Sequence, residues 1–266
     1  MEWYAAYLAL GAFVGFFAGL FGIGGGLVLV PVLSILFEAQ HLTTQSNLHL
    51  LALGTSMAAI ILSAVSSTRI HRNHGAVNVG IVRTFTPGLL LGTALGALFA
   101  SHVSPVYLTV FFALFVYFAA LQMLLDIKPK AMRQLPGRIG MTLAGAGIGA
   151  ISSLVSIGGG TISIPFMLRH NIPLQQAIGT SAALGLPIAI GGTLGYIATG
   201  LLLGNLPPYT LGYIYLPALF WIALASIITA PLGAKATHRL PLKLLRRSFA
   251  VLLLVLATRM LRNTLG

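Results

Sequence analysis

Long apolar segments with few charges run through most of the chain, and residues 48–67 form one of them. A helix rises 1.5 Å per residue, so a segment of about 20 apolar residues spans the roughly 30 Å hydrocarbon core of a bilayer. Of the 266 residues, 57% are hydrophobic and only 7% are charged, whereas an average soluble domain is charged at roughly a quarter of its positions. These features exclude an ordinary soluble fold and predict an all-α, polytopic membrane protein.

The formal net charge of +12 comes from 15 Lys and Arg against three acidic residues. In a soluble protein such a charge would suggest nucleic acid as the partner. Here the basic residues lie in the short gaps between apolar segments, as is typical of cytoplasmic loops in membrane proteins. We therefore expect the lipid bilayer as a partner, a multi-pass location in the plasma (inner) membrane, and no binding of nucleic acid.

Residue types that support enzyme chemistry are scarce. The chain has no cysteine, and its three acids, Glu2, Glu38 and Asp126, all lie near the ends of predicted helices. We therefore expect no thiolate nucleophile and no sulfur-ligated or carboxylate-ligated metal inside the membrane. Neither glycine-rich segment continues into the Gly-Lys-Ser/Thr of a phosphate-binding loop. The prediction is a protein that is not an enzyme, with no catalytic residues, no metal site and no cofactor.

The sequence contains an internal duplication. Segment 15–31 (GFFAGLFGIGGGLVLVP) aligns with 149–165 (GAISSLVSIGGGTISIP) at a constant offset of 134 residues, and Gly-Thr-Ser at 54–56 recurs at 179–181. Self-similarity of this kind indicates two related structural units. We predict three regions: a first transmembrane repeat over 1–127, a cytoplasmic linker over 128–136, and a second transmembrane repeat over 137–266.

Each repeat begins with a long element that glycines interrupt, and three simpler helices follow it. The predicted elements are 4–37, 47–68, 80–101 and 105–125 in the first repeat and 138–168, 174–200, 214–234 and 242–261 in the second. A continuous helix over 4–37 would be about 50 Å long, too long for one crossing without extreme tilt. Three consecutive glycines near its middle favour a break, because glycine destabilises a helix interior.

The basic residues distinguish two topologies. If each long element crosses the membrane once, only nine of the 15 Lys and Arg are cytoplasmic. If each enters and leaves on the same side, as a hairpin or re-entrant pair, thirteen are cytoplasmic and only Arg259 and Arg262 misfit. The second topology agrees with the positive-inside rule. It makes the second repeat inverted relative to the first, as in many secondary transporters.

The two glycine triplets are the candidate substrate site. Backbone groups freed by a helix break cannot remain in lipid, so they are buried in protein or face a wet cavity. The helix after each triplet begins with unpaired amides and the positive end of a helix dipole, which suits a small anion. The alternative is close helix packing, the interpretation we favour for the separate glycines at 11, 15, 19, 145 and 149. The triplets are Gly24, Gly25, Gly26, Gly158, Gly159 and Gly160.

Hydroxyl groups in the apolar helices are further candidates for binding the substrate. They can ligate an oxyanion without adding charge, although each could instead bond the carbonyl one turn earlier in its own helix. His49 either titrates or pairs with an anion during transport, or is an interfacial histidine. His71, with Arg72 and His74, is predicted to be a loop residue that fixes orientation. The hydroxyl candidates are Thr55, Ser56, Thr161, Ser163, Thr180 and Ser181.

The glycine pattern of 15–31, its second copy ending in Ile157-Gly-Gly-Gly-x4-Pro165, and the downstream Gly-Thr-Ser resemble the sulfite and organosulfonate exporter family TauE/SafE. The resemblance covers essentially the whole chain and implies transport of sulfite, sulfonates or related small anions. One departure is that Ser153 and Ser156 stand where the first copy has Gly19 and Gly22. The second copy is therefore the more polar one.

These observations predict a secondary transporter whose two glycine breaks meet near the membrane midplane and bind a small anion. By the resemblance, that anion is sulfite, an organosulfonate or a sulfur-containing carboxylate. The alternatives are a passive anion channel and a non-transporting membrane scaffold or enzyme. The sequence leaves open the direction of transport, the coupling ion and the formation of a homo-oligomer.

Overall fold

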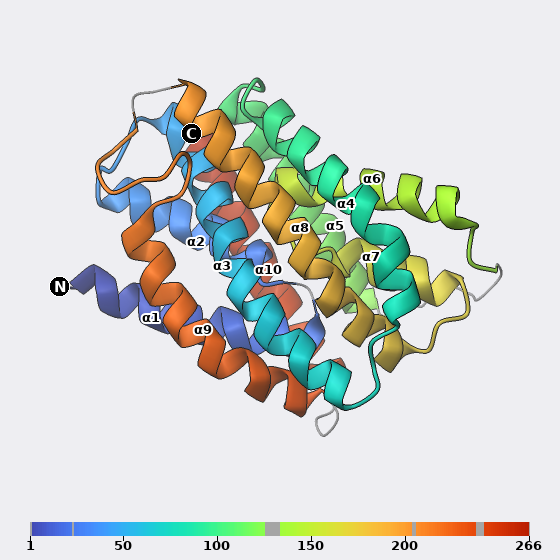
Figure 1. The fold of residues 1–266 in the computed structure, drawn as a ribbon. Coiled ribbons are helices and arrows are strands. Elements are labelled where there is room, and N and C mark those ends of the chain that lie inside the picture. The colour runs from blue at the N-terminus through green and yellow to red at the C-terminus, as the bar shows by residue number, and fades with distance from the viewer. Residues whose placement is uncertain (1, 23, 126–133, 204–205, 238–241, 266) are drawn as a thin grey trace.

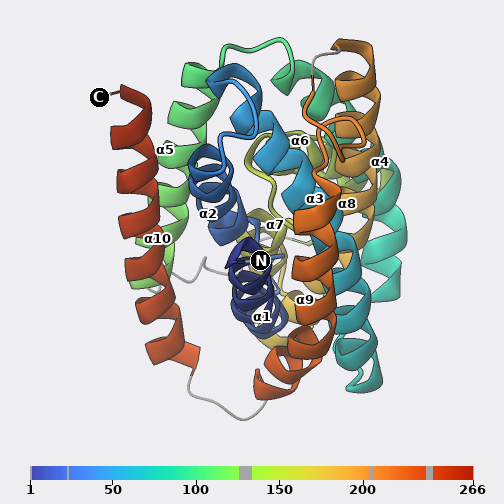
Figure 2. The same cartoon turned by 90° about the vertical axis from the view of Figure 1, so that its left-hand side faces the viewer.

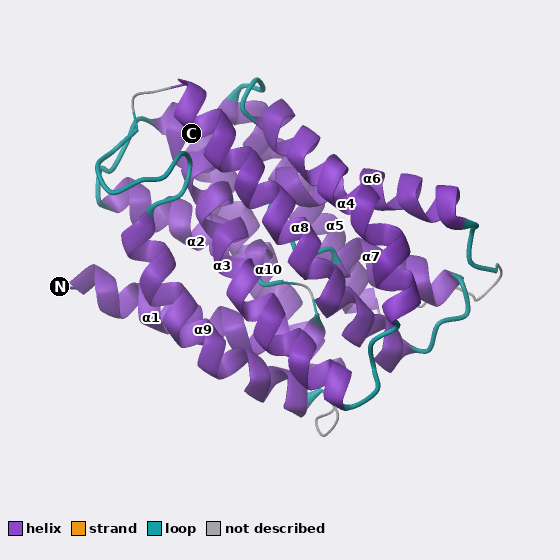
Figure 3. Cartoon of the chain, in the orientation of Figure 1, coloured by secondary structure: helices purple, strands orange, loops and turns teal. Residues whose placement is uncertain are grey.

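The computed structural model describes the chain except for residues 1, 23, 126–133, 204–205, 238–241 and 266 (Figure 1). Over the described residues it contains ten helices and no strand beyond a single bridge between Thr210 and Tyr215 (Figure 3). The prediction of an all-α fold is confirmed. Most of the predicted linker, residues 128–133, lies outside the described residues.

Five helices fall in the first predicted repeat and five in the second. The first five are α1 (Glu2–Phe21), α2 (Gly26–Ala39), α3 (Gln45–Asn73), α4 (Val79–Ala100) and α5 (Pro105–Leu125). The second five are α6 (Arg138–Val155), α7 (Gly160–Arg169), α8 (Leu174–Leu203), α9 (Leu216–Ala236) and α10 (Leu242–Leu265). Each long predicted element is thus two helices, and the break falls at the glycine triplet in both, as predicted.

Seven of the described helices are long and apolar enough to cross a membrane, namely α1, α3, α4, α5, α6, α8 and α9. The two helices that follow the breaks, α2 and α7, are shorter, with 14 and 10 residues. The predicted span at 242–261 forms a helix, α10, but α10 is not among the seven. Basic residues near both of its ends lower its mean hydropathy. The chain is a multi-pass membrane protein.

Helices α3 and α8 form the centre of the molecule, where they pack against each other and are largely enclosed by protein. The most extensive contacts on either side of them are between α1 and α9 and between α4 and α6. The α5–α10 pair stands at another side, with α2 between it and the central helices (Figure 2). The two broken elements, α1–α2 and α6–α7, are therefore held by helices from both halves of the chain.

The outward faces of the peripheral helices are apolar. Leu95 on α4, Leu114 on α5 and Ile228 on α9 are each more than half exposed. Large exposed apolar surfaces are rare on soluble monomers. Here they are the surfaces that lipid would cover.

The separate glycines let helices approach closely, as the packing interpretation predicts. A Cβ added to Gly15 would lie 2.6 Å from the Cα of Ser226 on α9, and one added to Gly149 would lie 2.6 Å from the carbonyl oxygen of Leu89 on α4. Real side chains do not tolerate such distances to backbone atoms. These glycines therefore determine how closely α1 packs on α9 and how closely α6 packs on α4.

The ends of α9 provide a test of membrane orientation. Tyr209 precedes α9 and Lys235 lies in its last turn, and both side chains are exposed. The chain has no native cysteine, so single cysteines can be introduced at these positions. A membrane-impermeant thiol reagent added to intact cells is expected to label Tyr209→Cys and to leave Lys235→Cys unlabelled until the cells are permeabilised. The reverse pattern would contradict the orientation inferred from the basic residues.

Candidate substrate site at the two glycine breaks

Both breaks use left-handed backbone conformations. The residues that precede α2 and α7 are Gly25, with φ of 77°, and Gly159, with φ of 83°. Gly24 also has positive φ, of 80°. Glycine adopts this region at little cost, whereas a residue with a side chain loses roughly 1–2 kcal/mol there. The glycines at these positions are thus required by the geometry of the breaks.

The two breaks lie against each other. A Cβ added to Gly24 would lie 2.5 Å from the Cα of Gly158, and one added to Gly26 would overlap the carbonyl oxygen of Ser156. Backbone from one half of the chain thus touches backbone from the other half with no side chain between. The structure brings together the two triplets that sequence reasoning selected.

Buried side chains satisfy the carbonyl groups at the ends of α1 and α6. The Thr237 hydroxyl donates to the Leu20 carbonyl over 2.7 Å, and the Tyr196 hydroxyl donates to the Ser153 carbonyl over 2.9 Å. His71 Nε2 lies 3.3 Å from the carbonyl oxygen of Gly19, a group that can only accept. The last carbonyls of a helix have no partner within that helix. Side chains of α3 and α8, and that of Thr237 directly after α9, supply partners here.

The amide ends of α2 and α7 differ from those carbonyl ends. No side chain caps either N-terminus, and neither first turn contains an acidic residue. The amides of Val28 and Leu29 bond to the Gly25 carbonyl, and that of Ser163 bonds to the Gly159 carbonyl. The partial positive charge of roughly half a unit at each helix start is therefore not neutralised by a side chain of that helix.

A small cavity of about 10 Å³ adjoins the contact between the breaks. That is roughly the space one water molecule occupies. Ser67 is 3% exposed and its hydroxyl has no hydrogen-bond partner, whereas the Ser63 hydroxyl donates to the Ile60 carbonyl over 3.1 Å. The lining residues are Ala18, Gly22, Gly24, Ser63, Ala64, Ser67, Gly158, Ala182 and Gly185.

Sequence reasoning missed Ser63 and Ser67. The available signal was the pair of serines one turn apart in a long apolar helix, opposite the small residues Ala182 and Gly185 of α8. Such a signal is weak, because small residues are common wherever membrane helices pack closely.

The predicted threonines have a structural role in the contact between the halves. Thr55 Oγ1 accepts a hydrogen bond of 3.0 Å from the amide of Tyr215, just before α9. Thr180 Oγ1 accepts one of 2.9 Å from the amide of Asn78, just before α4. In each case a threonine of one half satisfies the start of a helix in the other half. Neither threonine lines the cavity at the breaks.

The other predicted hydroxyls divide into bonded and unbonded groups. Ser181 donates to the Ile178 carbonyl over 2.8 Å, and its hydroxyl also lies 3.2 Å from the Gly22 carbonyl. Ser56, Thr161 and Ser163 are buried, and their hydroxyls have no hydrogen-bond partner. These three remain candidates for ligand binding, although none lines the described cavity.

The two histidines singled out in the sequence lie in different surroundings. His49 lines a different cavity, which shares no lining residue with the one at the breaks. The prediction that His71 is a loop residue is wrong. It lies within α3, is fully buried and contacts the Gly19 carbonyl.

The fold and the two discontinuous helices define a polytopic helical membrane protein of the transporter class. The family model for "Sulfite exporter TauE/SafE" matches residues 7–260, and the chain belongs to this family. The resemblance seen in the glycine motifs is therefore confirmed.

Similarity to relatives extends over nearly the whole chain. A "Probable membrane transporter protein" of Haemophilus influenzae is 39% identical over 95% of this chain and 96% of the relative. A protein of the same description from Methanocaldococcus jannaschii is 26% identical over 96% of this chain and 94% of the relative. No solved structure matches the chain. The family and these relatives are membrane transporters and not enzymes.

The threonine bonds between the halves lead to a stability prediction. Thr55→Val or Thr180→Val keeps the side-chain shape but leaves a backbone amide without its acceptor. We expect each variant to be destabilised by about 1–3 kcal/mol, measured as a lower melting temperature of the purified protein in detergent. Thr→Ser at the same position should restore most of the loss.

Thr84→Val is the matched control for this experiment. The Thr84 hydroxyl bonds only to carbonyls of its own helix, those of Gly80 and Ile81. Its loss should change the melting temperature little. If the Thr55 and Thr180 variants melted at the temperature of this control, the bonds between the halves would not matter for stability.

Proposed function

We propose that this protein is a secondary transporter of a small oxyanion, sulfite or an organosulfonate, in the plasma membrane, and that the anion binds where the two glycine breaks meet. The observation that supports this site is the cavity beside the Gly24–Gly158 contact, into which the unpartnered, buried Ser67 hydroxyl projects. A hydroxyl can donate to an oxyanion without adding charge. The family name gives the substrate class.

We further propose that the two halves are inverted repeats. In support, α1 packs on α9 whereas α6 packs on α4, so the first helix of each half uses the fourth helix of the other. The threonine bonds, from Thr55 to Tyr215 and from Thr180 to Asn78, are exchanged in the same way. In Figure 1 the start of α1 and the start of α6 lie at opposite sides of the molecule. Such an exchange is expected of a twofold axis in the membrane plane.

The size of the cavity indicates how transport would proceed. Sulfite is several times larger than the single water that about 10 Å³ can hold. The breaks must therefore separate before an anion enters between them. In the proposed cycle, the described conformation is closed around the site, and movement of one half against the other opens it to each side in turn.

Flux into proteoliposomes tests the proposal directly. The purified protein is expected to catalyse saturable uptake of radiolabelled sulfite and of a small sulfonate, with pH and Na⁺ gradients imposed separately. Flux that increases linearly with concentration would indicate a channel instead. Absence of flux for every sulfur oxyanion would overturn the assignment of substrate.

Ser67 gives the sharpest test of the site. Ser67→Ala removes a hydroxyl that makes no bond within the protein, so the amount of folded protein should not change. Loss of a hydrogen bond to an anion should lower transport at subsaturating sulfite by roughly tenfold. Ser66→Ala is the control, because the Ser66 hydroxyl bonds the Ile227 carbonyl and does not line the cavity. Equal transport by the two variants would remove Ser67 from the site.

The charge of the preferred anion is also testable. Among the described residues no Lys or Arg lines the cavity, and two helix starts supply about half a charge each. A second negative charge on the substrate would therefore remain costly to desolvate. At fixed total sulfite, transport should increase as pH falls through the bisulfite–sulfite transition without a proton gradient, whereas transport of a permanently monovalent sulfonate should change little. Equal pH profiles for the two substrates would contradict this account.

A further inference from the structure

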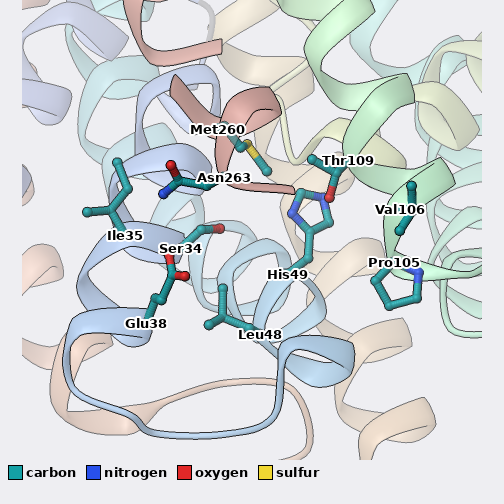
Figure 4. A pocket seen from close by; sticks show the side chains of 10 residues that line it. All are labelled: Ser34, Ile35, Glu38, Leu48, His49, Pro105, Val106, Thr109, Met260 and Asn263. Atoms are coloured by element: carbon teal, nitrogen blue, oxygen red, sulfur yellow. The ribbon is translucent and has the colours of Figure 1, made fainter. Parts of the chain in front are cut away.

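A second cavity, of about 230 Å³, lies among α2, α3, α5 and α10, apart from the glycine breaks (Figure 4). It lies near helix ends, because Pro105 is the first residue of α5, and Glu38 and Asn263 are close to the last residues of α2 and α10. Its lining residues are Ser34, Ile35, Glu38, Leu48, His49, Pro105, Val106, Thr109, Met260 and Asn263.

Two buried polar side chains that line this cavity have no hydrogen-bond partner. His49 is 4% exposed and neither ring nitrogen makes a hydrogen bond, and Ser34 is 8% exposed with an unbonded hydroxyl. Figure 4 shows the His49 ring beside Thr109, with Ser34 and Glu38 close together on α2. Buried polar atoms are almost always bonded. Two such side chains at one cavity indicate a ligand that bonds them.

The charge of the cavity selects a cation. Glu38 is the only charged residue that lines it, and no Lys or Arg of the described chain does. An anion would meet a carboxylate with no compensating positive side chain, which is unfavourable where desolvation is large. The preferred ligand of this cavity therefore has the opposite charge to the anion proposed at the glycine breaks.

The walls of the cavity select an organic cation. Half of the lining residues are apolar, and they lie on all four helices. Ca²⁺ takes about six to eight oxygen ligands and Mg²⁺ an octahedral shell of them, whereas the oxygen-bearing side chains here, Ser34, Glu38, Thr109 and Asn263, stand among apolar walls. A small aliphatic body fits this surface by burying its own apolar area.

We propose that this cavity binds a small organic ammonium ion. A primary ammonium group has three N–H donors. Glu38 supplies a carboxylate acceptor, neutral His49 supplies one ring nitrogen, and the Ser34 or Thr109 hydroxyl supplies the third acceptor. The same chemistry can come from a free amine or from the headgroup of an aminolipid, since the cavity lies at helix ends where headgroups are found.

Calorimetry on the purified protein tests the ligand class. The probes are n-propylammonium, n-propanol and propionate at equal ionic strength. Propylammonium should bind, while propanol and propionate should not. Glu38→Gln keeps the size of the side chain and should weaken propylammonium binding by at least about tenfold. The control Ser101→Ala, at a partly exposed residue that does not line the cavity, should bind as the parent does.

Two further variants keep the test decisive if Glu38→Gln does not fold. Ser34→Ala and Thr109→Val should each weaken propylammonium binding by a few-fold while the protein elutes as a single peak in size-exclusion chromatography. Propionate binding in place of propylammonium, or unchanged propylammonium binding in all three variants, would overturn the proposal. Failure here would leave sulfite flux through the glycine breaks unaffected, so the two proposals fail separately.

Native mass spectrometry distinguishes the two sources of the ammonium group, a free amine and an aminolipid headgroup. Protein from nanodiscs of phosphatidylethanolamine should retain a lipid that Glu38→Gln loses if the ligand is a headgroup, and protein from phosphatidylglycerol nanodiscs should retain none at this site. Propylammonium binding that is equal in both lipids would indicate a free amine. No bound ammonium from either source would contradict the proposal.

Discussion

The contact between the two glycine breaks is the constraint on which the rest of the structure depends. At Gly24 and Gly26 no room exists for even a methyl group, because Gly158 and the Ser156 carbonyl occupy that space. Helices in lipid gain little from the hydrophobic effect and associate through close packing and hydrogen bonds. The central helices α3 and α8, and the outer helices that contact α1 and α6, are arranged around this backbone contact.

Polar groups at the breaks are satisfied unequally, and the difference has a functional meaning. Thr237, His71 and Tyr196 contact carbonyl groups at the ends of α1 and α6. Without such partners, these buried carbonyls would be costly in free energy. The amide ends of α2 and α7 receive no side-chain cap. Three carbonyls at the described ends of the breaks thus have side-chain partners whereas the helix starts have no side-chain cap, an arrangement that suits the anion we propose. The second cavity, with Glu38 and no basic lining residue, has the opposite preference.

Much of this arrangement could be predicted from the sequence, because glycine triplets and apolar periodicity act locally. The two helix breaks follow from 15–31 and its copy, and the ten helices follow from these breaks together with the apolar segments along the chain. The roles of His71 and Tyr196 could not be predicted from residue type. They stand at the offset of 125 residues that also relates Thr55 to Thr180, and both contact the last turn of a broken helix. The imidazole of His71 and the phenol of Tyr196 each contact a helix-end carbonyl. Because the two residue types differ, comparison of the two halves of the sequence did not reveal this shared role.

The departure of the second copy from the first is compensated across the contact. Ser156, at the position of Gly22, donates to the Leu53 carbonyl of α3 over 3.0 Å. Gly22 has no side chain, but its carbonyl lies 3.2 Å from the hydroxyl of Ser181 on α8. In both halves a serine links the break to the central helix of the other half, once from the break and once from the helix. Each such bond contributes about 1 kcal/mol. The proposed alternating access requires two states within a few kcal/mol of each other, and in the described state the two breaks are held by bonds of the same kind despite their different sequences.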